Sequence, residues 1–245
     1  MRIPVIRGVI DRRILVNYRV DPNALQKVLP EPFRPQLVKG VGIGGICLIR
    51  LKHVRPRYLP GVMGTSSENA AHRIAVEWEQ DGELRSGVYV PRRDTSSRLN
   101  TLLGGRVFPG VHHHATFESR ERDGQYSVRM TSDDGNAQVR VDGHCCDAIP
   151  SNSILSSLNE ASSFFECGSL GYSATSCSGE YDGLELRTFD WTVEPLAVNR
   201  VESSFFGNAD VFPSGSAEFD CALLMRDIEH EWHGRESLKA ARGAD

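Results

Sequence analysis

Apolar and polar residues alternate along much of this chain, which is the pattern of strands that bury one face. The clearest case is Arg73–Glu79 and Leu84–Val90, which flank Asp81-Gly82, a dipeptide favoured in two-residue hairpin turns. Further strands are predicted over Ile14–Val20, Val41–Val54, His112–Ser119, Tyr126–Ser132, Ala137–Cys145, Leu184–Glu194 and Ala217–Ile228. Because closing such a sheet removes its exposed edges, we expect a mainly β fold (α+β) built as a closed or nearly closed antiparallel barrel.

Short helices are predicted over Asn23–Leu29, Thr95–Leu103 and Ser153–Phe165. Asp21-Pro22 supplies a cap and a first-turn proline to the first helix, and Asp94 is expected to cap the second. The third helix has apolar residues at every third or fourth position, as an amphipathic helix does. In the long strand, Gly42, Gly44 and Gly45 indicate a bulge or a close approach of another segment.

The length and composition suit one globular domain. At 245 residues, 40% hydrophobic and 24% charged, the chain can bury a sizeable core. Without an internal repeat or linker, we expect one domain over residues 1–235 and a polar C-terminal tail over residues 236–245. No run approaches the ~18 apolar residues of a membrane helix, and the N-terminus lacks the pattern of a signal peptide. These features predict a cytoplasmic protein without a membrane partner.

The charged residues and cysteines limit the partners and reactions that the sequence supports. The net charge is −4 with no block of like charge, which argues against a nucleic-acid partner. Among 28 basic residues the lysines are Lys27, Lys39, Lys52 and Lys239, so chemistry that needs an amine has four candidates. The six cysteines include no CxxC pair, and in a cytoplasmic protein we expect them to be reduced.

The segment Gly87–Glu118 holds most of the candidate chemistry, including three consecutive histidines. On a strand, His112 and His114 share one face, which is a common way to present two imidazoles to a metal ion. With Glu118 and the surrounding glycines they resemble the first metal motif of cupins, although Glu218 stands where the second motif needs a histidine. The alternative is that these histidines are half-buried polar side chains at a barrel mouth.

Charged side chains around this segment suggest a binding site for a small molecule. Arg92 and Arg98 flank the start of the predicted helix, where Arg98 can pair with Asp94 or bind a ligand carboxylate. Glu68 and His72 lie on the preceding strand. Inside a barrel they would meet a histidine of the triple and form a carboxylate–imidazole pair for acid/base chemistry.

Several motifs carry a resemblance to a known family. They are YRVDPNALQKVLPEP from Tyr18 to Pro32, then SENAAHRIAVEW, GVYVPRRDTSSRLNTLLGGRVFPG, and the late run FFECGSLGYSAT, WTVEPL and SSFFGN. In this order they resemble acetoacetate decarboxylase and, more specifically, an uncharacterised bacterial family beside that enzyme, over residues 10 to 233. The resemblance implies a cone-shaped, double-layered β-barrel with two or three short helices and a central cavity, and also implies a homo-oligomer.

The defining lysine of that family is missing here. Acetoacetate decarboxylase forms a Schiff base through a lysine whose pKa is depressed by desolvation and a neighbouring cation. The family places it just after an aromatic–proline pair, here Phe108-Pro109, which Gly110-Val111-His112 follows. We therefore do not expect Schiff-base chemistry. By the resemblance, Glu68 aligns with one cavity glutamate, a second is missing from Gly42–Cys47, and Arg12 is the closest candidate for a cavity arginine.

Three functions remain open. The first is a cavity protein that binds a small organic acid or carbonyl compound and acts on it as a lyase without a lysine. Its catalytic candidates are Glu68, His112 and His114, and its substrate-binding candidates are Arg12, Asn69, His72, Arg92 and Arg98. The second is a cupin-like metal enzyme with His112, His114 and Glu118 as ligands. The third is a ligand-binding module without catalysis. Except in the second, no cofactor is expected.

Overall fold

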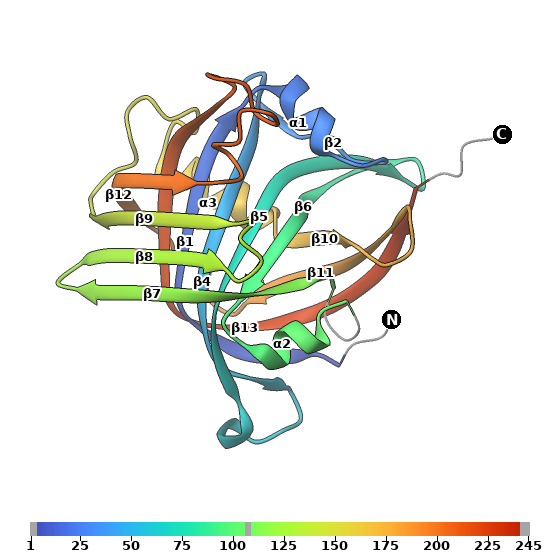
Figure 1. Ribbon diagram of the computed structural model, residues 1–245, viewed down its shortest axis with the longest axis vertical. Helices are drawn as coiled ribbons and strands as arrows, with labels where there is room; N and C mark the ends of the chain where they lie inside the picture. Colours follow the sequence, from blue (N-terminus) through green and yellow to red (C-terminus); the bar gives the residue numbers. More distant parts are fainter. Residues whose placement is uncertain (1–3, 106–108, 241–245) are drawn as a thin grey trace.

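The computed structural model describes residues 4–105 and 109–240, which form a mainly β fold (Figure 1). Its helices are α1 (Pro22–Val28), α2 (Arg98–Leu103), α3 (Leu158–Cys167) and the 3₁₀ turn η1 (Gly61–Met63). Its strands are β1 (Ile6–Val20), β2 (Arg34–Pro35), β3 (Leu37–Val38), β4 (Val41–Pro56), β5 (Thr65–Gln80), β6 (Glu83–Thr95), β7 (His112–Arg122), β8 (Gln125–Ser132), β9 (Gln138–Cys145), β10 (Leu170–Ala174), β11 (Glu180–Thr188), β12 (Glu194–Ser203) and β13 (Ala217–Lys239). The predicted fold class is confirmed.

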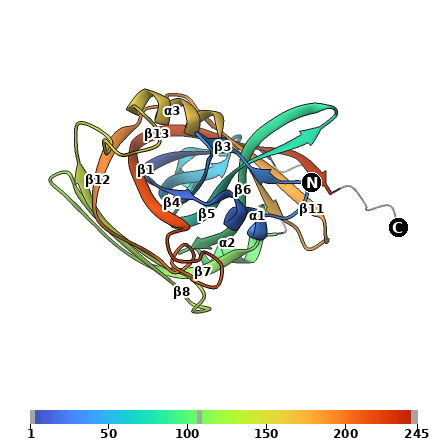
Figure 2. The ribbon, with the colours of Figure 1, turned by 90° about the horizontal axis from the view of Figure 1, so that it is seen from above.

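The strands form one sheet that closes on itself twice (Figures 1 and 2). The long strands β6, β5, β4, β1 and β13 are shared by both rings. One ring is completed by β7, β8, β9 and β12, and the other by β10 and β11, since β10 pairs with β6 and β11 with β13. The pairings of β6 with β7 and with β10 are parallel, whereas the neighbours within the shared set are antiparallel.

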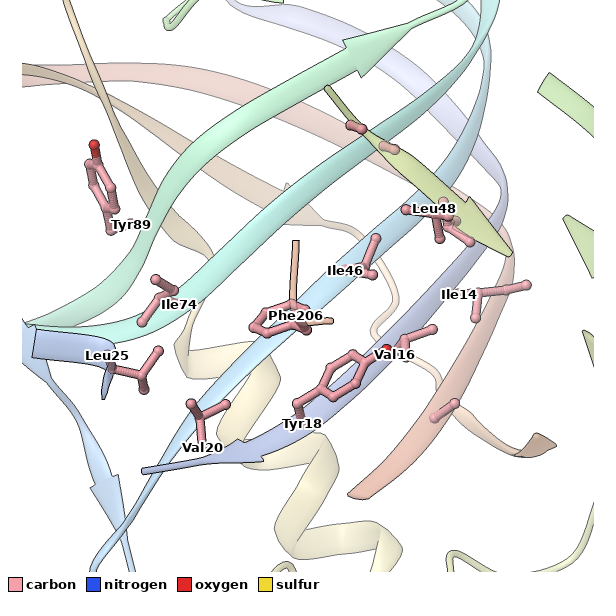
Figure 3. Close-up of a cluster of buried hydrophobic side chains, with 14 of the residues drawn as sticks. Ile14, Val16, Tyr18, Val20, Leu25, Ile46, Leu48, Ile74, Tyr89 and Phe206 are labelled. Carbon is pink, nitrogen blue, oxygen red and sulfur yellow. The ribbon is translucent and has the colours of Figure 1, made fainter. Parts of the chain in front are cut away.

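The shared strands bury both of their faces. On one face, inside the first ring, lies a large apolar cluster that includes Ile14, Val16, Ile46 and Leu48 (Figure 3). On the other face a second cluster packs beneath α3, which lies over β13 and β1 in Figure 2. Strands buried on both faces read as continuous apolar runs, which is why β4 looks so hydrophobic.

The glycines of β4 mark close approaches by other segments. A Cβ atom on Gly44 would stand 2.7 Å from the ring of Phe206, which itself stacks on Tyr18 with ring centroids 4.4 Å apart. A Cβ on Gly42 would meet the side chain of Leu25 from α1 at 2.4 Å. The glycine-rich pattern therefore reflects packing against a loop and a helix.

Two predicted helix starts are wrong. Asp94 does not cap α2, because it lies at the buried end of β6 and pairs with Arg92; Ser97 is the cap and accepts from the Asn100 amide. Likewise α3 begins after Ser157, because the preceding residues are held in turns by Asp220. In both places the hydrogen bonds of a buried carboxylate override the local helix pattern.

Several strands extend beyond their predicted ends. β1 starts at Ile6, and the predicted strand Leu184–Glu194 is two strands, β11 and β12. β13 ends at Lys239, so the start of the expected polar tail is paired with β11, and Leu238 is buried. Within the part of the chain that is described, no helix has the length and apolar character needed to cross a membrane.

Candidate anion-binding cavity

A cavity of about 180 Å³ lies between the second core cluster and β10–β11, and every strand of the second ring contributes to its lining. Its walls are largely apolar, from Leu15 and Ile49 on the shared strands to Phe165 on α3 and Trp232 on β13. Its polar lining residues are Arg13, Gln36, Cys47, Asn69, Arg73, Arg93, Asp94, Asn100, His112 and Ser169. We call this space the arginine cavity, after Arg13, Arg73 and Arg93. A space of this size holds considerably more than one water molecule.

Within the described residues, the side-chain partners of Arg13, on β1, are two sulfur atoms and an aromatic ring. Its Nε donates to the Sγ atom of Cys47 at 3.2 Å, and its Nη1 lies 3.7 Å from the Sδ atom of Met225. The guanidinium also lies 5.9 Å from the ring centroid of Trp191. Sulfur and ring faces are weak acceptors, so this cation has unused capacity for a strong acceptor such as a carboxylate.

Arg73, on β5, is buried beside the same cavity. It donates to the side-chain oxygen of Asn17 and lies 4.7 Å from the ring centroid of Phe165. Its Nε has no hydrogen-bond partner among the described residues. A Cβ on Gly45 would stand 3.2 Å from this guanidinium and 2.5 Å from the backbone oxygen of Val16, so the glycine leaves room for the arginine to cross β4.

Arg93, at the end of β6, is the third cation. Its Nε and Nη2 donate to the hydroxyl of Ser173 at 3.3 and 3.2 Å. Desolvation by burial lowers the pKa of Arg73 and of Arg93 to about 10, so both remain positively charged at neutral pH. Gly110, which has a φ of +77°, lets the chain pass against Ser173.

The three guanidinium groups therefore carry charge without a counter-ion. Over residues 4–105 and 109–240, none of Arg13, Arg73 and Arg93 forms an ion pair with a carboxylate. The lining carboxylate, Asp94, is fully buried and engaged by Arg92. Burying unpaired charge is costly, and an anion bound in the cavity would offset that cost.

His112, at the start of β7, faces the same cavity and is register partner of Arg93. Burial, aided by the charge of Arg93, lowers the pKa of His112 to about 4, so the imidazole is neutral at pH 7. Its Nδ1 lies 3.1 Å from the carbonyl oxygen of Gly110, and because a carbonyl can only accept, Nδ1 carries the proton. A Cβ on Gly104 would stand 2.5 Å from this ring, so the end of α2 packs directly on it.

Glu68 and Arg12 lie together, but outside the lining of the arginine cavity. Arg12, fully buried, donates from Nη2 to Glu68 at 2.5 Å and forms an ion pair with Glu121 at 3.1 Å. Arg50 contacts Glu68 at 2.7 Å and Glu121 at 2.7 Å. The structure does not bring Glu68 to His112; it places Glu68 in a closed network of charges between β1, β4, β5 and β7.

The remaining substrate-binding candidates lie in different parts of the structure and do not form one site. Asn69 lines the arginine cavity, and its side-chain oxygen accepts from Thr95 at 2.8 Å. His72 is fully buried in the first core, 5.0 Å from the ring of Phe205. Arg92 bridges Asp94 and Asp134, and Arg98 is exposed on α2.

The three residues of the metal alternative are not brought together. His112 faces the arginine cavity, His114 pairs with Asp133 at 2.7 Å, and Glu118 is exposed further along β7. Among the described residues, no group of three or more histidine, cysteine or acidic side chains is arranged to hold a metal ion. Phe108, of the predicted aromatic–proline pair, lies outside the described residues.

Sequence reasoning missed Arg13, Arg73 and Cys47 as cavity residues. Each lies on a strand whose successive side chains point to opposite faces of the sheet. The alternating pattern shows that a face is buried, but it does not distinguish a cavity from a packed core. A local signal did exist for Arg73: it is a charged residue opposite the glycine-rich stretch of β4, with Gly45 as its register partner.

Comparisons with known proteins agree with this architecture. A family model named DUF2071, described as an uncharacterized conserved protein, matches residues 10–168. Among curated proteins, none matches the sequence.

The solved structures that resemble this chain share its fold at low identity. Acetoacetate decarboxylase from Legionella pneumophila is 11% identical with a TM-score of 0.59, covering 94% of this chain and 86% of its own. An acetoacetate decarboxylase-like enzyme from Sphingomonas wittichii is 11% identical with a TM-score of 0.60, covering 98% and 94%. The enduracididine biosynthesis enzyme MppR, in complex with pyruvate, is 11% identical with a TM-score of 0.58, covering 96% and 90%.

Proposed function

Because the chain belongs to the DUF2071 family of uncharacterized conserved proteins and has the acetoacetate decarboxylase-like fold, we propose that it uses the arginine cavity to bind a small organic carboxylate. One observation carries the proposal: Arg13, Arg73 and Arg93 line one cavity and, among the described residues, have no carboxylate partner. Guanidinium groups are well suited to carboxylates, which they bind through paired hydrogen bonds. The structural neighbour MppR was solved with pyruvate, which is such an acid.

The apolar walls add a second requirement for the ligand. Leu15, Ile49 and Val90 face the cavity together with the rings of Phe164 and Phe165. A few fixed polar groups in a mainly apolar pocket are the usual arrangement for small molecules, where the polar groups orient the ligand. The ligand we propose therefore has one charged end and a short apolar or carbonyl-bearing remainder.

Titration calorimetry with matched ligands tests the proposal. Pyruvate and propionate are expected to bind, and propionamide, which has nearly the same shape without the charge, is not. Arg93→Gln should weaken carboxylate binding about tenfold or more, because a charged hydrogen bond is lost. Arg98→Gln removes an exposed arginine outside the cavity and serves as the control. Equal affinity for the amide, or an unchanged affinity in Arg93→Gln, would contradict the proposal.

A second candidate is a lyase that acts on the bound acid without a Schiff base. Its support is His112, an imidazole that lines the cavity next to Arg93, since imidazoles are the groups most often used for proton transfer. None of the four lysines is among the cavity lining residues in the described part of the chain. Proton NMR in deuterated water would detect exchange or decarboxylation of acetoacetate or pyruvate. Turnover that survives His112→Asn would remove this role.

The location and assembly of the protein are part of the same proposal. We infer a cytoplasmic protein, with which the six free cysteines agree. We also infer a homo-oligomer, as the family resemblance implies. Light scattering coupled to size-exclusion chromatography measures the assembly directly, and a monomeric mass would refute that part.

A further inference from the structure

Cys47 has surroundings that no other cysteine of the chain shares. It lies on β4, is buried at 7% exposure, and lines the arginine cavity. Its Sγ accepts a hydrogen bond from Nε of Arg13 at 3.2 Å, and Arg73 and Arg93 line the same cavity. The sulfur therefore contacts one of the three cations directly and shares the cavity with the other two.

An independent observation shows that this part of the cavity is built for a ligand. Arg73 is only 5% exposed, lines the cavity, and its Nε has no hydrogen-bond partner in the described part of the chain. A buried charged donor without an acceptor is rare in proteins. An anion that satisfies it would be held close to the thiol, because both groups face the same small space.

The other thiols lack this combination. Cys167 and Cys177 are exposed at the surface, and Cys145 and Cys146 are half-buried outside the lining of the arginine cavity. Cys221 is fully buried, and desolvation raises its pKa to about 12, so it stays protonated and inert. Cations next to a thiol stabilise the negative charge that a nucleophilic sulfur carries, and Cys47 has such a cation in direct contact.

We propose that Cys47 is a nucleophile of the arginine cavity, which bonds covalently to a small carboxylate that carries an electrophilic carbon. The proposal rests on the proposed function, since the arginines hold the acid while the sulfur reacts. With an oxo-acid, the sulfur forms a bond to the carbonyl carbon and the carbon–oxygen π bond breaks. Its electron pair moves to the oxygen, which takes the proton that the thiol loses. The product is a thiohemiketal, and the addition needs no oxidant or reductant.

Alkylation with two probes of opposite character tests this. Iodoacetate is an anionic electrophile and iodoacetamide is its neutral counterpart; each forms a carbon–sulfur bond and releases iodide, and the thiol proton goes to the buffer. Peptide mass spectrometry of the folded protein gives the rate at each cysteine. We expect the ratio of iodoacetate to iodoacetamide rates to be about tenfold higher at Cys47 than at Cys167 and Cys177, because the cations concentrate the anion. The exposed cysteines are internal controls within the same molecule.

Two further measurements complete the test. Excess propionate should slow iodoacetate at Cys47 without changing Cys167, and this arm uses only the unaltered protein. Arg13→Gln should remove the preference for the anion, provided that its circular dichroism matches that of the parent. No reaction at Cys47, or an equal ratio of iodoacetate to iodoacetamide rates at all cysteines, would overturn the proposal that Cys47 is a nucleophile. If calorimetry still shows carboxylate binding in that case, the proposed function stands and only the role of Cys47 fails.

Discussion

His72 gives the sharpest test of how burial controls charge in this fold. Its ring is fully buried in the first core, 5.0 Å from the ring of Phe205 and 6.4 Å from that of Phe206. Among the described residues, neither ring nitrogen has a hydrogen-bond partner. Its register partner on β6 is Arg92, whose positive charge acts on it. Burial and the charge of Arg92 therefore disfavour the protonated form of this imidazole.

The magnitude follows from the titration of that ring. Desolvation, with a smaller contribution from Arg92, lowers the pKa of His72 from 6.5 to about 4. Between pH 6.5 and about pH 4, His72 is protonated in the unfolded chain and neutral in the folded chain. The free energy of unfolding therefore falls as the pH drops through this window. At about 1.4 kcal/mol per pH unit, the full effect on the free energy of unfolding is about 3 kcal/mol.

Replacing His72 with leucine tests this value. The substitution introduces an apolar side chain of similar size and removes two nitrogens that have no hydrogen-bond partner among the described residues, so stability at about pH 7.5 should be equal or higher. Urea unfolding at about pH 7.5 and about pH 4.5 should show a loss about 3 kcal/mol smaller in His72→Leu than in the parent. His144→Leu, at an exposed position of β9, is the matched control and should not change the loss. If the parent and His72→Leu lose stability in parallel, the argument from burial is refuted.

The remaining predictions concern the charge network and the cavity. Glu68→Gln should lower the free energy of unfolding by about 1–3 kcal/mol, because the buried Arg12 loses one of its two charged partners and keeps Glu121, while calorimetry shows unchanged carboxylate binding. Gly45→Ala should lower the free energy of unfolding in urea by about 1–3 kcal/mol and weaken carboxylate binding, because the new Cβ displaces Arg73. Gly61→Ala should change neither, because the nearest atom to a Cβ there is 3.8 Å away. Since the pKa of His112 is about 4, carboxylate affinity should stay constant from about pH 5.5 to about pH 8.5, and a midpoint near 6.5 would contradict this. Borohydride with acetoacetate should leave the parent unlabelled, and should label His112→Lys, whose amine would be desolvated beside a guanidinium.

Sequence periodicity predicts an element well where no neighbouring side chain offers a hydrogen bond or ion pair that competes with the local turn or cap. The hairpin around Asp81-Gly82 forms as expected, and Asp81 and Gly82 both take positive φ values. The start of α2 is different, because Asp94 has the local features of a cap but a stronger partner in Arg92. That partner is two residues away on the same strand, and the choice between them depends on burial that the local sequence does not encode.

The candidate site shows a more specific limit. Arg12 and His72 were among the substrate-binding residues expected from the sequence, yet the cavity is lined by their neighbours Arg13 and Arg73. Successive residues of a strand point to opposite faces, so an error of one position moves a side chain from the cavity to the core. A bulge next to the first pair, in β1 between Ile10 and Arg12, also changes the parity in a way that an alternating pattern cannot predict.

No lysine is among the described lining residues of the cavity, whereas one amine performs two tasks in acetoacetate decarboxylase. An amine in a desolvated, cationic pocket both sits near the substrate charge and forms the covalent bond. A guanidinium binds carboxylates at least as well but stays protonated and forms no imine, so in our proposal Arg13, Arg73 and Arg93 supply binding alone. A covalent step in this cavity therefore needs a different side chain, and among the described lining residues Cys47 is the one whose sulfur atom Arg13 contacts directly.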